Sequence, residues 1–183
     1  MLNCIVEALA LAGTLLPLVV ALPLMGALAI GARLVAGVHG DDSEPATAGL
    51  ARGAGLASLL LLAALSVGSF AATAKGTQAF GEWFAAPGFA VNLSFASDTQ
   101  SLLLALVVAF LGWVTLVFST NYLHREAGFH RFFLAMCLFL AGMQLIVLSG
   151  NAVLGFIGWE LCGLSSWLLI GFSDERPLAT GNA

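Results

Sequence analysis

The stretch that decides the fold is 150–172, GNAVLGFIGWELCGLSSWLLIGF, in which Glu160 is the one charged residue. A bilayer core of about 30 Å is crossed by a helix of roughly 20 predominantly apolar residues. In lipid a helix satisfies its backbone hydrogen-bonding groups within its own segment. We therefore predict a membrane-spanning helix over 152–172, with a single acid in its interior.

Working outward, four further segments lack charged residues and are long enough to span or nearly span a bilayer. Charged residues make up 9% of the chain, against about 25% in an average soluble domain. Apolar residues make up 60%, too many for a soluble globular domain to cover with polar surface. The chain is thus predicted to be an all-α integral membrane protein, a single membrane domain over 1–183. Its other expected spans are 8–30, 53–74, 101–120 and 132–148.

The connections between the spans differ in character. Residues 39–49 form a polar stretch that is expected to be a loop. Between the second and third spans, apolar and small or polar residues alternate over 89–95, the period of a strand with one buried face. Pro87-Gly88 is a turn signal just before it, and Asp98 suits the N-cap of the third helix. We expect a short external β-hairpin here.

The distribution of lysine and arginine predicts the orientation. With five spans, one side of the membrane carries only Lys75. The other side carries five arginines, which places the N-terminus outside and the C-terminus in the cytoplasm, or in the matrix of an organelle. A bacterial or organellar inner membrane is the expected location. The five residues are Arg33, Arg52, Arg125, Arg131 and Arg176.

Glu160 is the residue that composition does not explain. It lies about eight residues, or about 12 Å, into its span, near the middle of the bilayer. A carboxylate there costs at least ~2.5 kcal/mol on insertion scales, so it must face protein or water, pair with a cation, or stay protonated. We predict that Glu160 carries protons; the alternative is a hydrogen bond that pins neighbouring helices. The other four predicted spans hold no countercharge, so a partner must come from elsewhere.

Three further residues are candidates for a proton entrance. Gln144 could line a hydrated path in the fourth span or simply bond two helices together. His124 and His130 lie between the third and fourth spans. Histidine is the residue type that can exchange protons near neutral pH, and a solvated turn is the plainer interpretation. The three cysteines form no disulfide or zinc pattern, and no motif for a metal or redox cofactor is present. Six basic residues against ten acidic ones leave no footprint for nucleic acid.

Three sequences, PGFAVNLSFASD at 87–98, EAGFHRFF at 126–133 and the opening stretch, resemble a known family. They are similar to the N-terminal helices of the antiporter-like membrane subunit of respiratory complex I, called subunit L in bacteria and subunit 5 in mitochondria. The resemblance implies that Glu160 takes the place of the family's mid-membrane glutamate, which works with a lysine on the seventh helix. That helix has no counterpart in this chain, so we expect a split subunit or a truncated one.

The function expected from this resemblance is that of a proton-translocating subunit, in its N-terminal part, of an NADH:quinone oxidoreductase of the respiratory chain. Such a subunit has no redox centre, and whether it counts as an enzyme depends on its complex. Its partners would be other membrane subunits, including a chain that supplies the lysine, and the lipid bilayer. A cation/proton antiporter of the Mrp type, a membrane-bound hydrogenase and an inorganic-carbon uptake complex share the motif. A purely structural scaffold segment is the other alternative.

Overall fold

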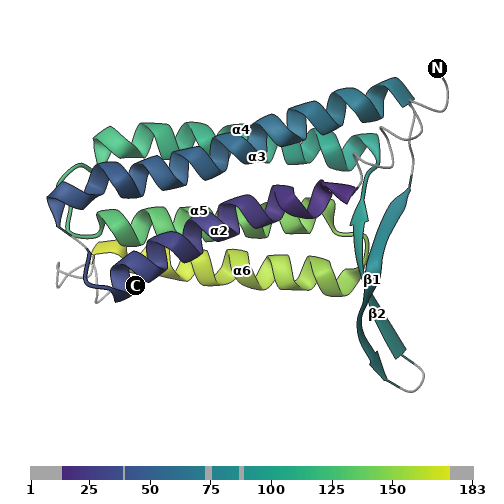
Figure 1. The fold of residues 1–183 in the computed structure, drawn as a ribbon. Helices are drawn as coiled ribbons and strands as arrows, with labels where there is room; N and C mark the ends of the chain where they lie inside the picture. Colours follow the sequence, from purple (N-terminus) through teal and green to yellow (C-terminus); the bar gives the residue numbers. More distant parts are fainter. Residues whose placement is uncertain (1–13, 39, 73–75, 87–88, 174–183) are drawn as a thin grey trace.

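The computed structural model describes residues 14–38, 40–72, 76–86 and 89–173. Helices dominate it, and one two-stranded sheet interrupts them (Figure 1). Five of the described helices are long and apolar enough to cross a membrane, which confirms the predicted fold class. The elements are α2 (Leu16–Val35), η1 (Asp41–Ser43), α3 (Glu44–Ala72), β1 (Thr77–Ala86), β2 (Phe89–Ala96), α4 (Thr99–Tyr122), α5 (Phe129–Leu148), α6 (Ala152–Ile170) and η2 (Gly171–Ser173).

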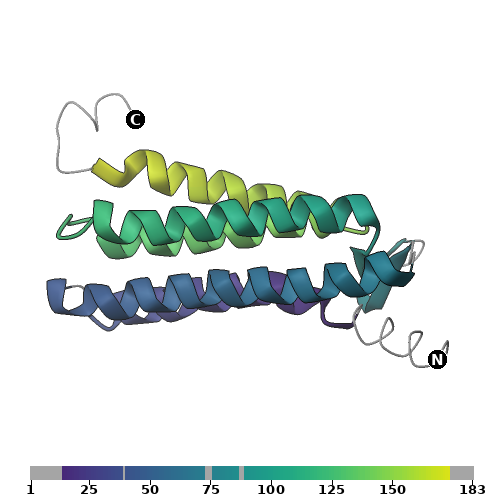
Figure 2. The ribbon, with the colours of Figure 1, turned by 90° about the horizontal axis from the view of Figure 1, so that it is seen from above.

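The helices run side by side, and α5 lies at the centre. It packs against α2, α3, α4 and α6, and it is the most deeply buried of the five. Helix α6 packs mainly on α5 and has the smallest buried share of the spanning helices. Figure 2 shows the consequence: α6 lies along one edge of the bundle, and α2 and α3 lie along the opposite edge. One broad face of α6 therefore has no neighbour in the described chain.

The prediction of a loop at 39–49 is wrong over most of its length, because α3 begins at Glu44. Pro45 follows directly, and proline suits the first turn of a helix, where its missing N–H has no intrahelical acceptor. Helix α2 likewise continues to Val35 and takes Arg33 into its last turn, where a cation is favourable. For α3, α4 and α5, the charge-free windows marked the most apolar part of a longer helix. Residues 8–13 and 73–74 of the predicted segments lie outside the described residues, as do Lys75 and Arg176 of the charge count.

The predicted hairpin is present between α3 and α4. Strands β1 and β2 pair antiparallel, and Val91 and Phe95 of β2 are buried, as the alternation indicated. The hairpin is fixed to the loop before α6, where the N–H of Gly150 donates to the carbonyl of Ser94 at 2.8 Å. A side chain at 150 would stand 2.8 Å from the Ser94 backbone, so only glycine fits. The predicted turn at Pro87-Gly88 lies outside the described residues.

One local prediction, the N-cap of the third span, is confirmed by the side chains. Asp98 caps α4: its carboxylate accepts the N–H groups of Gln100 and Ser101, each at 3.0 Å. These bonds, together with one from the Ser101 hydroxyl, hold the pKa of Asp98 below its ordinary value. Cys137 and Cys162 are free thiols buried among helices, where they pack as small hydrophobes. Cys4 lies outside the described residues.

Candidate functional site

Glu160 lies in the middle of α6, on the helix face turned away from the bundle. Its side chain is exposed, and it has no hydrogen-bond or ion-pair partner among the described residues. Large apolar side chains surround it on the same face; Trp159 is 64% and Trp167 70% exposed. The N-cap of α6 is Asn151, whose carboxamide oxygen accepts the N–H of Leu154 at 2.8 Å.

The opposite face of α6 fixes this orientation. A Cβ placed on Gly158 would stand 2.8 Å from the carbonyl oxygen of Gly142 and from the amide nitrogen of Ile146, so α6 and α5 touch through their backbones here. Leu154, Cys162 and Ser165 are buried along the same face. Small residues allow such close approach between membrane helices. Because Gly158 faces α5, Glu160 two positions later points outward.

An outward-facing carboxylate on a spanning helix carries a free-energy cost that depends on what covers it. In contact with lipid it would be costly, by ~2.5 kcal/mol or more at the bilayer centre. The exposed apolar residues beside it, Phe156 and Leu164, are suited to contact with lipid or with another helix. Contact of this face with another protein segment or with water would therefore lower the free-energy cost of the Glu160 carboxylate. Chemically, Glu160 can bind and release a proton or pair with a cation brought by a neighbour.

Gln144 lies on a different side of α5 from this surface. It is fully buried, and its Nε2 donates to the hydroxyl of Ser58 on α3 at 2.9 Å. That hydroxyl in turn lies 2.9 Å from the carbonyl oxygen of Val19 on α2, to which it donates. The structure therefore brings Gln144 together with α2 and α3, and no hydrogen bond connects it to Glu160. This is the interhelical bond that was the alternative to a hydrated path.

His124 and His130 lie at the end of the bundle where α4 joins α5. Nδ1 of His124 is 2.7 Å from a carboxylate oxygen of Glu44, the first residue of α3. The other oxygen of Glu44 accepts the N–H of Arg125 at 2.9 Å. His130 is buried, and its Nδ1 lies 2.8 Å from Oγ1 of Thr47, one turn further along α3. His124 thus joins the start of α3 to the α4–α5 connection, and His130 joins it to the first turn of α5.

Sequence reasoning missed three residues of these contacts: Glu44, Thr47 and Ser58. Each lies on α3, and two of them fall in the segment expected to be a loop. The Glu-Pro pair at 44–45, followed by small and apolar residues, is a helix-start signal that could have extended the helix. Their side-chain partners lie at least 80 positions away in sequence, which no local pattern reveals. Among the described residues, no three potential metal ligands gather at one place.

Comparison with known proteins gives one family match and a set of relatives. The family described as NADH-ubiquinone oxidoreductase (complex I), chain 5 N-terminus, matches residues 83–133. NADH-quinone oxidoreductase subunit L of Neisseria meningitidis serogroup A is 31% identical over 91% of this chain and 24% of its own length. Subunit L of Escherichia coli K12 is 33% identical over 89% of this chain and 26% of its own length.

A chloroplast relative shows the same similarity over a shorter stretch. NAD(P)H-quinone oxidoreductase subunit 5 of Citrus sinensis is 33% identical over 57% of this chain and 14% of its own length. The chain spans about a quarter of the length of the two bacterial relatives above. The two bacterial matches extend over about nine-tenths of the chain. The family match is shorter and runs from within β1, through β2 and α4, to the start of α5.

Proposed function

We propose, from the premise that this chain corresponds to an N-terminal portion of a complex I antiporter-like subunit, that it takes part in proton translocation by an NADH:quinone oxidoreductase. The similarity to subunit L and subunit 5 supports the subunit type. The five apolar helices and these relatives support a multi-pass protein of an inner membrane. Translocation, its coupling to NADH oxidation and the partner chains are parts of the proposal.

Glu160 is the proposed proton carrier. The observation that supports this most is its position: a carboxylate at mid-helix, on the one broad face of α6 that the described chain leaves uncovered. A partner segment bearing a lysine would cover this face and complete the pair. Approach of the lysine favours the ionised carboxylate, and its withdrawal in an apolar setting favours the protonated one. A group with two such environments can take up a proton from one side and release it to the other.

The remaining candidates take lesser places in this proposal. His124 and His130 would stand near a proton entrance, at the end of the bundle that the arginine count assigns to the cytoplasm or matrix. Their bonds to Glu44 and Thr47 give both of them a structural role as well. For Gln144, the full burial and the bonds to α2 and α3 support helix packing over a hydrated path.

The test replaces Glu160 in the assembled complex. Glu160→Gln keeps the size of the side chain but cannot release a proton. In membrane vesicles energised with NADH, we expect the complex to assemble and the number of protons moved per NADH to fall. Glu126→Gln is the matched control, because Glu126 is an exposed loop acid. Full translocation by the Glu160→Gln variant would refute the carrier role.

A second function from the same superfamily differs in the transported species. Mrp-type cation/proton antiporters share the motif around Glu160, so the same carboxylate would serve Na⁺/H⁺ exchange there. Na⁺ flux measured in the same vesicles, without NADH, separates this function from NADH-linked pumping. If the Glu160→Gln variant assembles less without any change in ion movement per complex, the scaffold alternative is the correct one.

A further inference from the structure

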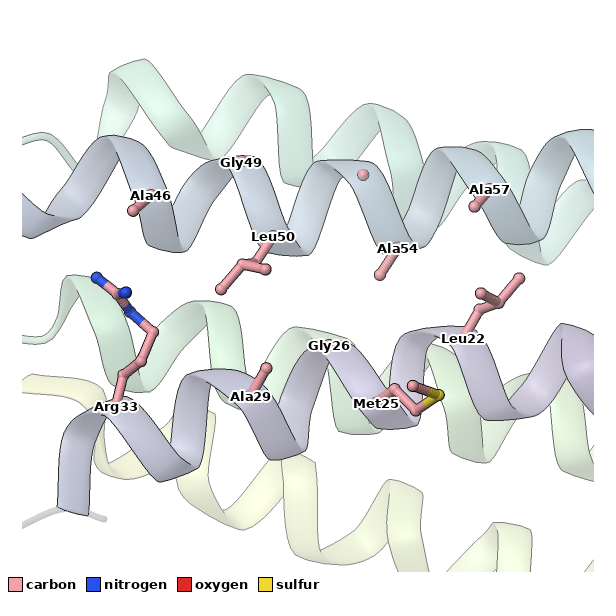
Figure 3. Close-up of a pocket in the computed structure, with 11 residues that line it drawn as sticks. Leu22, Met25, Gly26, Ala29, Arg33, Ala46, Gly49, Leu50, Ala54 and Ala57 are labelled. Carbon is pink, nitrogen blue, oxygen red and sulfur yellow. The ribbon is translucent and has the colours of Figure 1, made fainter. Parts of the chain in front are cut away.

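A groove between α2 and α3 lies on the side of the bundle opposite α6. Figure 3 shows the side chains of the two helices that line it, and its volume is about 680 Å³. That volume falls in the range of ligand-binding clefts, roughly 300–1,000 Å³. Every lining residue is apolar or glycine except Arg33, which stands at one end. From these features we propose that the groove binds one acyl chain of an anionic phospholipid, with the phosphate of its headgroup at Arg33.

Residues with little or no side chain on α3 leave the groove open. Gly49, Gly53 and Ala57 follow one another at intervals of four and so lie on one face of the helix. A Cβ placed on Gly49 or Gly53 would meet nothing within 4 Å, so this space is open. Across the groove, Leu22 and Met25 of α2 form the other wall, and Met25 is 63% exposed. A slender apolar chain fits between walls of this kind.

Arg33 gives the groove its preference for an anion. Figure 3 shows its side chain crossing from the last turn of α2 toward the start of α3, near Ala46. Its Nε is shielded from solvent yet has no hydrogen-bond partner in the described structure. Within that same part of the chain, no carboxylate lies at ion-pair distance from its guanidinium. The acid that begins α3, Glu44, is engaged by His124 and Arg125 instead.

The position of Arg33 along the helix matches the place of a headgroup. Both Arg33 and the start of α3 lie where α2 and α3 are joined, at the end of two spanning helices. Basic pockets between membrane helices at this level bind anionic headgroups. A shielded N–H donor without an acceptor costs free energy, and a phosphate oxygen would accept from it. A second helix in the groove would cover the small residues but would need a carboxylate at the same height.

The experiment measures which lipid the full chain retains. The protein is purified from membranes in mild detergent with the chains that accompany it, incubated with equal amounts of phosphatidylglycerol and phosphatidylcholine, and examined by native mass spectrometry. We expect the unaltered protein to bind phosphatidylglycerol preferentially, and Arg33→Gln to reduce that preference at least threefold. Glycerol 3-phosphate, which has the phosphate but no acyl chain, should not displace the lipid.

Two further variants keep the proposal falsifiable. Arg52→Gln, on α3, also removes one positive charge. Arg52 does not line the groove, and its Nε donates to the carbonyl of Ala48, so lipid binding should not change. Gly53→Leu fills open space and should lower the binding of both lipids while circular dichroism stays the same. Equal lipid preference in Arg33→Gln and the unaltered protein would overturn the proposal. So would a Gly53→Leu variant that keeps its lipid but loses an accompanying chain, since a helix would then be the occupant.

Discussion

Glu44 and His124 are 80 residues apart in sequence, and their side chains meet at 2.7 Å. The carboxylate of Glu44 is almost fully buried, with 6% of its side chain exposed, whereas His124 is 58% exposed. The second oxygen of Glu44 accepts the backbone N–H of Arg125, which has a left-handed backbone conformation with φ of 65°. One acid thus holds both a side chain and a strained backbone segment of the α4–α5 connection against the start of α3.

Replacing Glu44 by alanine should therefore destabilise the bundle. The N–H of Arg125 loses its acceptor in a partly buried place, which costs about 1–3 kcal/mol. Thermal unfolding in detergent, followed by circular dichroism, measures the effect. Glu126→Ala is the control, because Glu126 is exposed in the same connection, and it should leave the midpoint unchanged. Equal stability of the two variants would show that the Glu44 contacts contribute nothing.

The cap at Asp98 predicts a pH-dependent contribution to stability. The pKa of Asp98 is lower in the folded chain than its ordinary value of 3.8, so the contribution is present above that value. It is lost as the pH falls through the folded pKa. At neutral pH, Asp98→Ala should cost about 0.5–2 kcal/mol, and Asp98→Asn much less, because asparagine is an equally good cap.

Unfolding midpoints at pH 7 and near pH 3 measure this difference. The gap between the unaltered chain and Asp98→Asn should narrow as the pH falls below 3.8, because protonation of the Asp98 carboxyl group removes the charge that strengthens its bonds to the cap. Solvent screening reduces the charge-dependent part, since Asp98 is only partly buried. A gap that widens in acid would contradict the assigned direction of the pKa shift.

The contact between Gly158 and Gly142 predicts that substitution of Gly158 destabilises the fold, whereas substitution of Gly163 is tolerated. Gly158→Ala would place a methyl group 2.8 Å from the Gly142 carbonyl oxygen and should force α6 away from α5. We expect a loss of stability of about 1–3 kcal/mol from this overpacking. Gly163→Ala meets nothing within 4 Å in the described chain and should be neutral or slightly stabilising. The two variants are compared by thermal unfolding.

The bond between Gln144 and Ser58 can be tested by a double-mutant cycle. Ser58→Ala leaves the buried carboxamide of Gln144 without its partner, a loss of about 1–3 kcal/mol. Adding Gln144→Leu removes the unsatisfied group and should recover a large share of that loss. Strictly additive losses in the double variant would mean that the two side chains do not act as a pair. Unchanged proton movement in the double variant would further support the packing role.

Much of the fold was predictable because the signals are local. Composition and the length of the apolar segments indicated five helices, and the alternation at 89–95 indicated the strand β2. Helix ends were less predictable: the polar stretch at 39–49 looked like a loop, yet α3 starts at Glu44. The side-chain partners of Glu44 and Thr47 at that end of α3 come from the α4–α5 connection and from the first turn of α5.

The sequence by itself determined that this is a bundle of membrane helices with one acid in the middle of the last described span. Both facts depend only on the order of residues along one segment, because lipid excludes charge and requires internal backbone bonding. Only the tertiary structure decided which way Glu160 points and which groups Glu44, Gln144 and Arg33 approach. Apolar residues lie on every side of helix α6, so its pattern does not indicate a buried face; the close contact of Gly158 with Gly142 does.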